Sequence, residues 1–150
     1  MPAPTNIPIT SYPATTRQAA GHIDGVLTDV MSSFFSDKIM VTVTQKGRLA
    51  QWINVPLDVT NPSATDQYLP SANEEDSLLP MTHLTPRTLL GGATEERETL
   101  GQLYAAQIAS LIASKNPQEK RTVMVGLGLS KVEASREDFY NTIDLVRKCL

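Results

Sequence analysis

The 150-residue sequence has little of what most catalytic or secreted proteins need: one cysteine, Cys149, and two histidines, His22 and His83. A single cysteine cannot form a disulfide within the chain, so we expect a reducing compartment, the cytoplasm or also the nucleus. No apolar run approaches the roughly 18–20 residues that cross a bilayer. The N-terminus also lacks the basic and apolar regions of a signal peptide. We therefore predict no membrane contact.

Strong charge is missing as well. The formal net charge is −3, too close to neutral for an electrostatic nucleic-acid binder, so no nucleic-acid partner is expected. Neither histidine has partner ligands near it in the sequence, and Cys149 is predicted to be a small buried residue at a helix end. Gly91-Gly92 could hold an anion, but no lysine is near. The acidic run 74–76 lacks the spacing of a calcium loop. We predict a protein that is not an enzyme and has no metal or cofactor, with a hydrolase as an alternative.

Proline and basic residues are unevenly distributed. Nine of the ten prolines fall in residues 1–13 or 56–86, and no lysine or arginine occurs between Arg48 and Arg87, where five acids lie. Such composition buries too little apolar area to offset the entropy of ordering. We therefore predict a disordered N-terminal tail over 1–16 and a single domain over 17–150, interrupted by a disordered acidic insertion at about 58–84.

Alternating apolar residues predict strands over 17–23, 26–36, 37–45 and 48–57. In the third of these, Ile39, Val41 and Val43 share one face, and Met40 and Thr42 share the other. Asp24-Gly25 and Lys46-Gly47 supply turns, so the four segments are expected to form an antiparallel meander. A fifth short strand over 85–90 starts with Pro86, which favours an edge position.

Two helices and one more strand complete the chain. Thr94 and Ser135 are expected to cap helices, and the first helix has an apolar stripe that includes Leu103 and ends near Pro117. The segment 122–129 predicts a strand, with Gly126 and Gly128 on one face, leaving room for a close backbone or helix approach. The order β-β-β-β-β-α-β-α predicts an α+β fold: an antiparallel sheet of about six strands with both helices on one face.

The sheet face away from the helices is expected to carry function. A single sheet covered on one side must have its other side solvated or paired, and here that side includes Met40, Thr42, Trp52 and Asn54. Exposed Met and Trp favour an interface, so we predict dimerisation through this surface. The alternative is a sheet that curls and buries these side chains itself.

Several segments, taken in order, resemble the proteasome assembly chaperone 3 family. They are Phe34-Phe35-Ser36, Ile39-Met40-Val41, Val43-Thr44-Gln45 with Gly47 after it, Leu89-Leu90-Gly91, Leu111-Ile112, Val123-Met124-Val125, and the final run from Leu145 to Cys149. The resemblance covers residues 17–57 and 85–150. It lapses in the Pro/Thr-rich N-terminus and in the acidic insertion, so no contact is transferred across them.

The resemblance implies a non-enzymatic chaperone without nucleotide or metal. Members of the family form homodimers or pair with a similarly folded proteasome assembly chaperone 4. The pair binds free α-type subunits of the 20S proteasome, notably the α5 subunit, promotes α-ring assembly and leaves before the mature particle forms. For the client subunit we favour Lys46 and Arg48, basic groups in an acidic chain, with a solvated turn as the alternative. A small α+β adaptor for another complex remains the alternative function.

Overall fold

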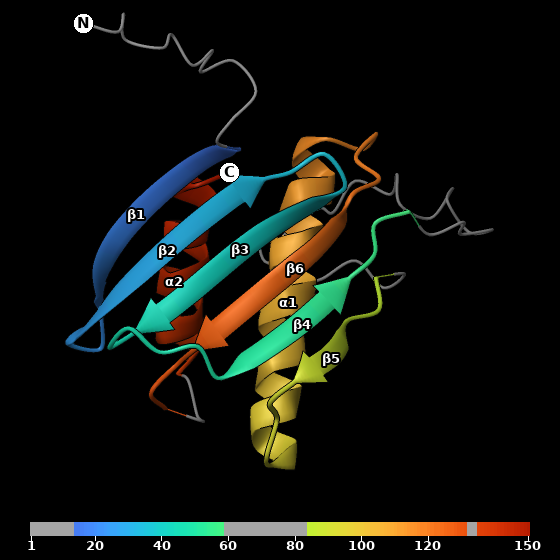
Figure 1. The fold of residues 1–150 in the computed structure, drawn as a ribbon. Helices are drawn as coiled ribbons and strands as arrows, with labels where there is room; N and C mark the ends of the chain where they lie inside the picture. The colour runs from blue at the N-terminus through green and yellow to red at the C-terminus, as the bar shows by residue number, and fades with distance from the viewer. Residues whose placement is uncertain (1–13, 59–83, 132–134) are drawn as a thin grey trace, which may run out of the picture.

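The computed structural model describes residues 14–58, 84–131 and 135–150 of the chain. These residues form a six-stranded sheet with both helices on one of its faces (Figure 1), as expected from the order of the predicted segments. The elements in chain order are β1 (Thr15–Ile23), β2 (Val26–Phe34), β3 (Lys38–Gln45), β4 (Gln51–Val55), β5 (Arg87–Leu90), α1 (Glu95–Lys115), β6 (Thr122–Gly128) and α2 (Arg136–Lys148).

The strand order in the sheet is β1-β2-β3-β6-β4-β5, which corrects the predicted meander. The first three strands pair as expected, but β3 and β4 do not form a hairpin. Instead β6 lies between them, parallel to β3 and antiparallel to β4. The sheet is therefore mixed, although mostly antiparallel. The α+β class, the six strands and the placement of the two helices are confirmed.

The short link from Lys46 to Ala50 passes over the end of β6. Ala50 N–H donates to Leu127 O at 2.8 Å, which joins the link to β6. A Cβ built on Gly128 would lie 1.4 Å from Arg48 O, so only glycine allows the two backbones to approach this closely. The close backbone approach that was predicted beside Gly126 and Gly128 thus occurs, with Arg48 lying against Gly128.

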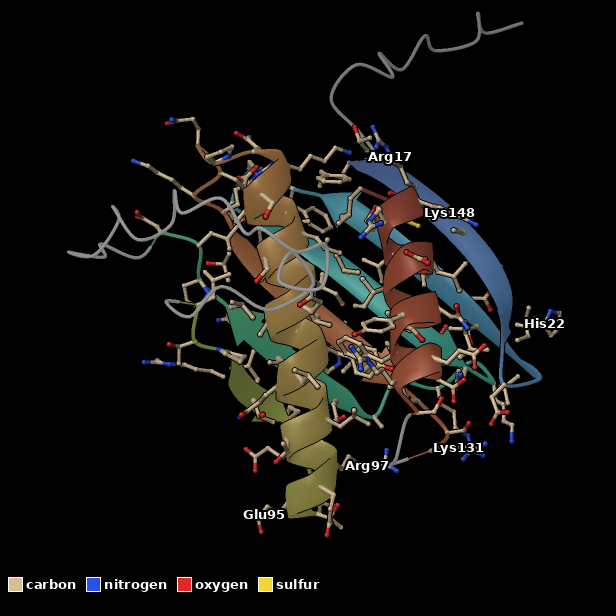
Figure 2. All side chains as sticks on the ribbon, turned by 180° about the vertical axis from the view of Figure 1, so that it is seen from behind. Arg17, His22, Glu95, Arg97, Lys131 and Lys148 are labelled. Atoms are coloured by element: carbon tan, nitrogen blue, oxygen red, sulfur yellow. The ribbon has the colours of Figure 1, made fainter. Side chains whose placement is uncertain are left out.

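The core lies between the sheet and the helices. Ile39, Val41 and Val43 of β3 are at most 1% exposed and face the helices with the inward residues of β4 and β6. Tyr104 of α1 and Phe139 of α2 meet with ring centroids 4.7 Å apart, so the two helices also pack on each other. Figure 2 shows both helices side by side over this face. The opposite face of the sheet carries no described helix.

Both helix starts follow the predicted capping residues. The Thr94 side chain accepts a hydrogen bond from Arg97 N, and the Ser135 side chain accepts one from Asp138 N. α1 ends at Lys115, just before Pro117. One residue of the predicted apolar stripe is misplaced, because Leu103 is 43% exposed. Buried residues occupy most sides of α1 from Tyr104 to Ser110, so its interior pattern is broader than one stripe.

The boundaries of the predicted tail and insertion shift slightly. β1 begins at Thr15, so Thr15 and Thr16 belong to the sheet rather than to the tail. Leu84, placed in the insertion by composition, is 6% exposed and packs in the core. Residues 1–13 and 59–83 lie outside the described residues, and so does His83. Within the described part of the chain, no helix is both long and apolar enough to span a membrane.

Candidate functional site

The four residues predicted for the dimer interface lie in two neighbouring rows on the helix-free face, the open face. One row runs from Met40 across Met124 to Asn54, and the next runs from Thr42 across Gly126 to Trp52. The insertion of β6 thus separates the members that come from β3 and β4, but it leaves them on one side of the sheet.

An apolar groove of about 550 Å³ lies on the open face and extends toward β5. Its lining includes Met40 and Trp52 from the predicted set, together with Phe35, Asp37, Lys38, Leu89, Leu90 and Met124. Leu89 and Leu90 are 50% and 67% exposed, and Phe35 is 38% exposed. Large apolar side chains exposed together in a groove are typical of a protein interface.

Trp52 occupies the space that Gly126 leaves open. A Cβ on Gly126 would lie 2.9 Å from Cζ3 of Trp52 and 3.2 Å from Cδ2 of Leu49. The six-membered ring of the indole therefore lies over Gly126 of the neighbouring strand. This packing fixes one wall of the groove.

The other two predicted residues play a different part in this surface. Thr42 is only 7% exposed, and neither Thr42 nor Asn54 lines the groove. The Asn54 Oδ1 atom is buried and has no hydrogen-bond partner among the described residues. The groove is instead lined by Met124, Leu89 and Leu90, which were not predicted from the sequence as interface residues. The alternation in 122–129 was a signal for Met124, because it faces away from Val123 and Val125.

Lys46 and Arg48 are exposed and lie in the link that follows β3. Lys46 has φ 56° and Gly47 has φ 65°, so the chain makes a tight turn there. The groove reaches Asp37 and Lys38 at the beginning of β3. Because a strand rises about 3.3 Å per residue, the basic turn lies roughly 25 Å from that end of the groove. Trp52, which also lines the groove, follows Arg48 by only four residues, so the two predicted surfaces are distinct but lie about 13 Å apart at this end.

Gln45 holds the basic turn in place. Its Oε1 accepts hydrogen bonds from the backbone N–H and hydroxyl of Ser130 at 2.8 and 2.9 Å, and its Nε2 donates to Thr28 Oγ1 at 2.9 Å. Lys131, next to Ser130, pairs with Asp24 of the β1–β2 turn. Three connections at this end of the sheet are thus joined through side chains immediately beside Lys46.

We expect Gln45→Met to lower the free energy of unfolding by about 2 kcal/mol, because a side chain of similar size leaves the Ser130 and Thr28 groups without their partner. Urea unfolding followed by circular dichroism measures this change as a lower midpoint at constant slope. Thr44→Val is the matched control, since the Thr44 hydroxyl makes only one exposed 3.5 Å contact with Asp29 O. Equal midpoints for the two variants would contradict the role given to Gln45.

Of the residues that the structure describes, only two titratable side chains line the open-face groove, Asp37 and Lys38, which pair with each other at 3.7 Å. Asp24, Tyr104, Lys131 and Asp138 line a cavity of about 30 Å³, which holds about one water, whereas ligand sites usually measure about 300–1,000 Å³. Burial raises the pKa of Tyr104 and of the Cys149 thiol. Cys149 is fully buried, as predicted, and His22 is exposed on β1. Among the described residues, no three metal-binding side chains come together.

The sequence was compared with models of known protein families. The sequence profile of the family described as Proteasome assembly chaperone 3 matches residues 41–149. The chain belongs to this family. The match starts within β3 and includes every element from β4 to α2, so it contains the basic turn and the groove residues Trp52, Leu89, Leu90 and Met124.

Solved structures show the same fold. A chain in the crystal structure of a novel chaperone complex for yeast 20S proteasome assembly superposes with a TM-score of 0.62. The alignment covers 89% of this chain and 96% of that chain at 12% sequence identity. A likeness at this identity establishes the shared fold. A search of curated protein sequences gives no significant match.

Proposed function

We propose that this member of the proteasome assembly chaperone 3 family is a non-enzymatic chaperone for 20S proteasome assembly that acts in the cytoplasm or nucleus. It pairs with a second chain through its open face, either a copy of itself or a related proteasome assembly chaperone 4. The pair binds α-type subunits, with the α5 subunit as the preferred client, and promotes α-ring formation before it is released.

The apolar groove supports the proposed pairing through the open face. Phe35, Leu89 and Leu90 are exposed although the chain has a complete core on the other side of the sheet. Burying such side chains against a partner sheet is favourable by about 25 cal/mol for each Å² of apolar area. The aromatic and methionine side chains around the groove are types enriched at protein interfaces.

The position of the basic turn supports the second part of the proposal, the binding of α-type subunits. Lys46 and Arg48 do not line the groove and lie beyond its Trp52 end, in the link that follows β3, so pairing through the groove leaves them accessible. A chaperone that binds a client and then releases it needs complementary charge and modest affinity rather than a large apolar contact. The exposed turn fits that requirement.

The experiment that tests the function is reconstitution with purified proteins. The full chain, alone and mixed with a purified chaperone 4 protein, is titrated with the isolated α5 subunit and, in parallel, with other α-type subunits. We expect a stable chaperone pair and a stoichiometric complex with α5. An absence of binding to every α-type subunit by both chaperone preparations would overturn the proposed function.

We expect the double variant Lys46→Glu/Arg48→Glu to bind the α5 subunit about tenfold more weakly at low ionic strength, with pairing to the second chaperone unchanged. Isothermal titration at two salt concentrations measures the loss and its screening by salt. Lys120→Glu is the matched control, because Lys120 is also exposed but lies between α1 and β6, away from the turn. Wild-type affinity of the double variant would rule out the turn as the client contact.

A further inference from the structure

The two edges of the sheet differ in how well they are protected against pairing with another strand. β5 forms one edge and has only four residues, follows Pro86, and shifts register against β4 at Trp52/Ile53. Short length, proline and irregular pairing are common ways of blocking an edge. This edge is therefore a poor template for a further strand.

β1 forms the other edge and has none of these features. Its nine residues pair with β2 in continuous register, without a bulge or proline, and Arg17 is its only charged residue. No described strand pairs with its outer side. Figure 2 shows β1 curving past α2 with His22 at the margin of the fold. A long, regular edge of this kind presents a row of unpaired backbone groups.

The turn between β1 and β2 fixes which residues present these groups. Asp24 and Gly25 both have positive φ, at 51° and 75°, and they connect the paired residues Ile23 and Val26. In such a two-residue hairpin the flanking pair exchanges both backbone hydrogen bonds, and bonded pairs then alternate along the strands. The odd-numbered residues of β1 thus bond to β2. The even-numbered residues Thr16, Gln18, Ala20 and His22 direct their N–H and C=O groups outward.

We propose that β1 is a second interface of this protein, at which two copies of the chain pair antiparallel across a two-fold axis at Ala19. This register is the one that engages all four outward-facing residues. Gln18 lies opposite Ala20 of the partner copy and Thr16 lies opposite its His22. Four bonded pairs give eight backbone hydrogen bonds. The pairing joins two six-stranded sheets into one and leaves both open faces accessible.

The side chains of β1 suit a second copy of the same strand. Ala19, Ala20 and Gly21 are small, so nothing bulky meets at the axis. The two Arg17 side chains start about 13 Å apart, which exceeds the Debye length of about 8 Å at physiological salt. With one charge in nine residues, the edge has no electrostatic feature that would select a foreign segment. Because an edge contact buries little area, the association is weaker than pairing through the open face.

Disulfide trapping tests the register directly. Single variants Gln18→Cys, Ala20→Cys, Thr16→Cys and His22→Cys place one new thiol on the exposed edge, while Cys149 stays buried. After mild oxidation at high protein concentration, we expect cross-linked dimers when Gln18→Cys is mixed with Ala20→Cys, and when Thr16→Cys is mixed with His22→Cys. Each variant alone should cross-link severalfold less. Leu27→Cys, on β2, controls for random collision.

Sedimentation of the full chain gives the second measurement, in a Trp52→Lys background that removes pairing through the open face. We expect a concentration-dependent dimer that Ala20→Pro weakens at least tenfold, because the Ala20 N–H points outward and its loss breaks no bond to β2. If circular dichroism shows that the proline variant is not folded, Ala20→Lys replaces it, because it places two like charges near the two-fold axis. A strict monomer in the parent, or cross-linking that ignores position, would overturn the proposal while leaving the open-face function intact.

Discussion

Gly128→Ala is expected to lower the free energy of unfolding by about 3 kcal/mol or more, because an added Cβ overlaps its neighbours more closely here than at the other glycines. The added Cβ would lie 1.4 Å from Arg48 O and 2.4 Å from Arg48 C. Both neighbours are backbone atoms, so no rotamer change relieves the overlap. The link must move, and its hydrogen bond from Ala50 N to Leu127 O is then strained or lost.

Urea and thermal unfolding measure this effect, with Trp52 as an internal probe because it is the only tryptophan and lies against the neighbouring Gly126. A loss of 3 kcal/mol lowers the thermal midpoint by roughly 6–12 °C in a domain of this size. Gly25→Ala separates steric overlap from backbone strain. Gly25 has φ 75° and no atom within 4 Å of an added Cβ, so we expect a loss of only about 1 kcal/mol there. Similar losses at both positions would contradict the explanation by close approach.

Local patterns predicted the elements well because each one depends on nearby residues. The alternation in Ile39, Val41 and Val43 defines the buried face of β3, and the hydroxyls of Thr94 and Ser135 cap the helices as the sequence indicates. The edge position of β5 follows in the same way from Pro86. These features require no knowledge of distant segments.

The separation of β3 from β4 could not be predicted in this way. A short glycine-containing link between two alternating segments is the usual pattern of a hairpin. Here β6, which starts 77 residues after Gln45, is inserted between the two strands. The pair Gly126 and Gly128 is a local signal that another backbone or a large ring approaches β6 closely, but it does not identify the neighbouring strands.

The side of the sheet on which the candidate residues lie could also be predicted from local alternation. Because side chains alternate with a period of two, Met40 and Trp52 stay on the open face whichever strand separates them. The remaining groove residues depend on the sheet order. Leu89 and Leu90 reach the groove only because β5 pairs with β4, and Met124 does so because β6 lies at the centre. The glycines of β6 indicate a close approach, but no local pattern identifies which strands lie beside β6 or β5.

Trp52→Lys is expected to weaken pairing through the open face about 100-fold, which corresponds to roughly 3 kcal/mol. Trp52 forms one wall of the groove, and tryptophan in a well-packed pocket is the residue type that most often dominates binding energy. Lysine removes the ring and would place a charge in a contact that excludes water, where an unpaired charge is costly. The fold should tolerate the change with a loss near 1 kcal/mol, since the side chain is half-buried on the outer face of the sheet.

Analytical ultracentrifugation of the full chain, with and without a purified chaperone 4 protein, measures the pairing. Leu103→Lys is the control, because Leu103 is an exposed apolar residue on α1, on the other side of the sheet from the groove. We expect it to leave pairing unchanged. Comparing the two variants shows whether the groove is an interface or only an exposed apolar surface. If folded Trp52→Lys pairs as tightly as the wild type, the interface lies elsewhere. The β1 edge would then be the first alternative, and the variants at Ala20 would identify it.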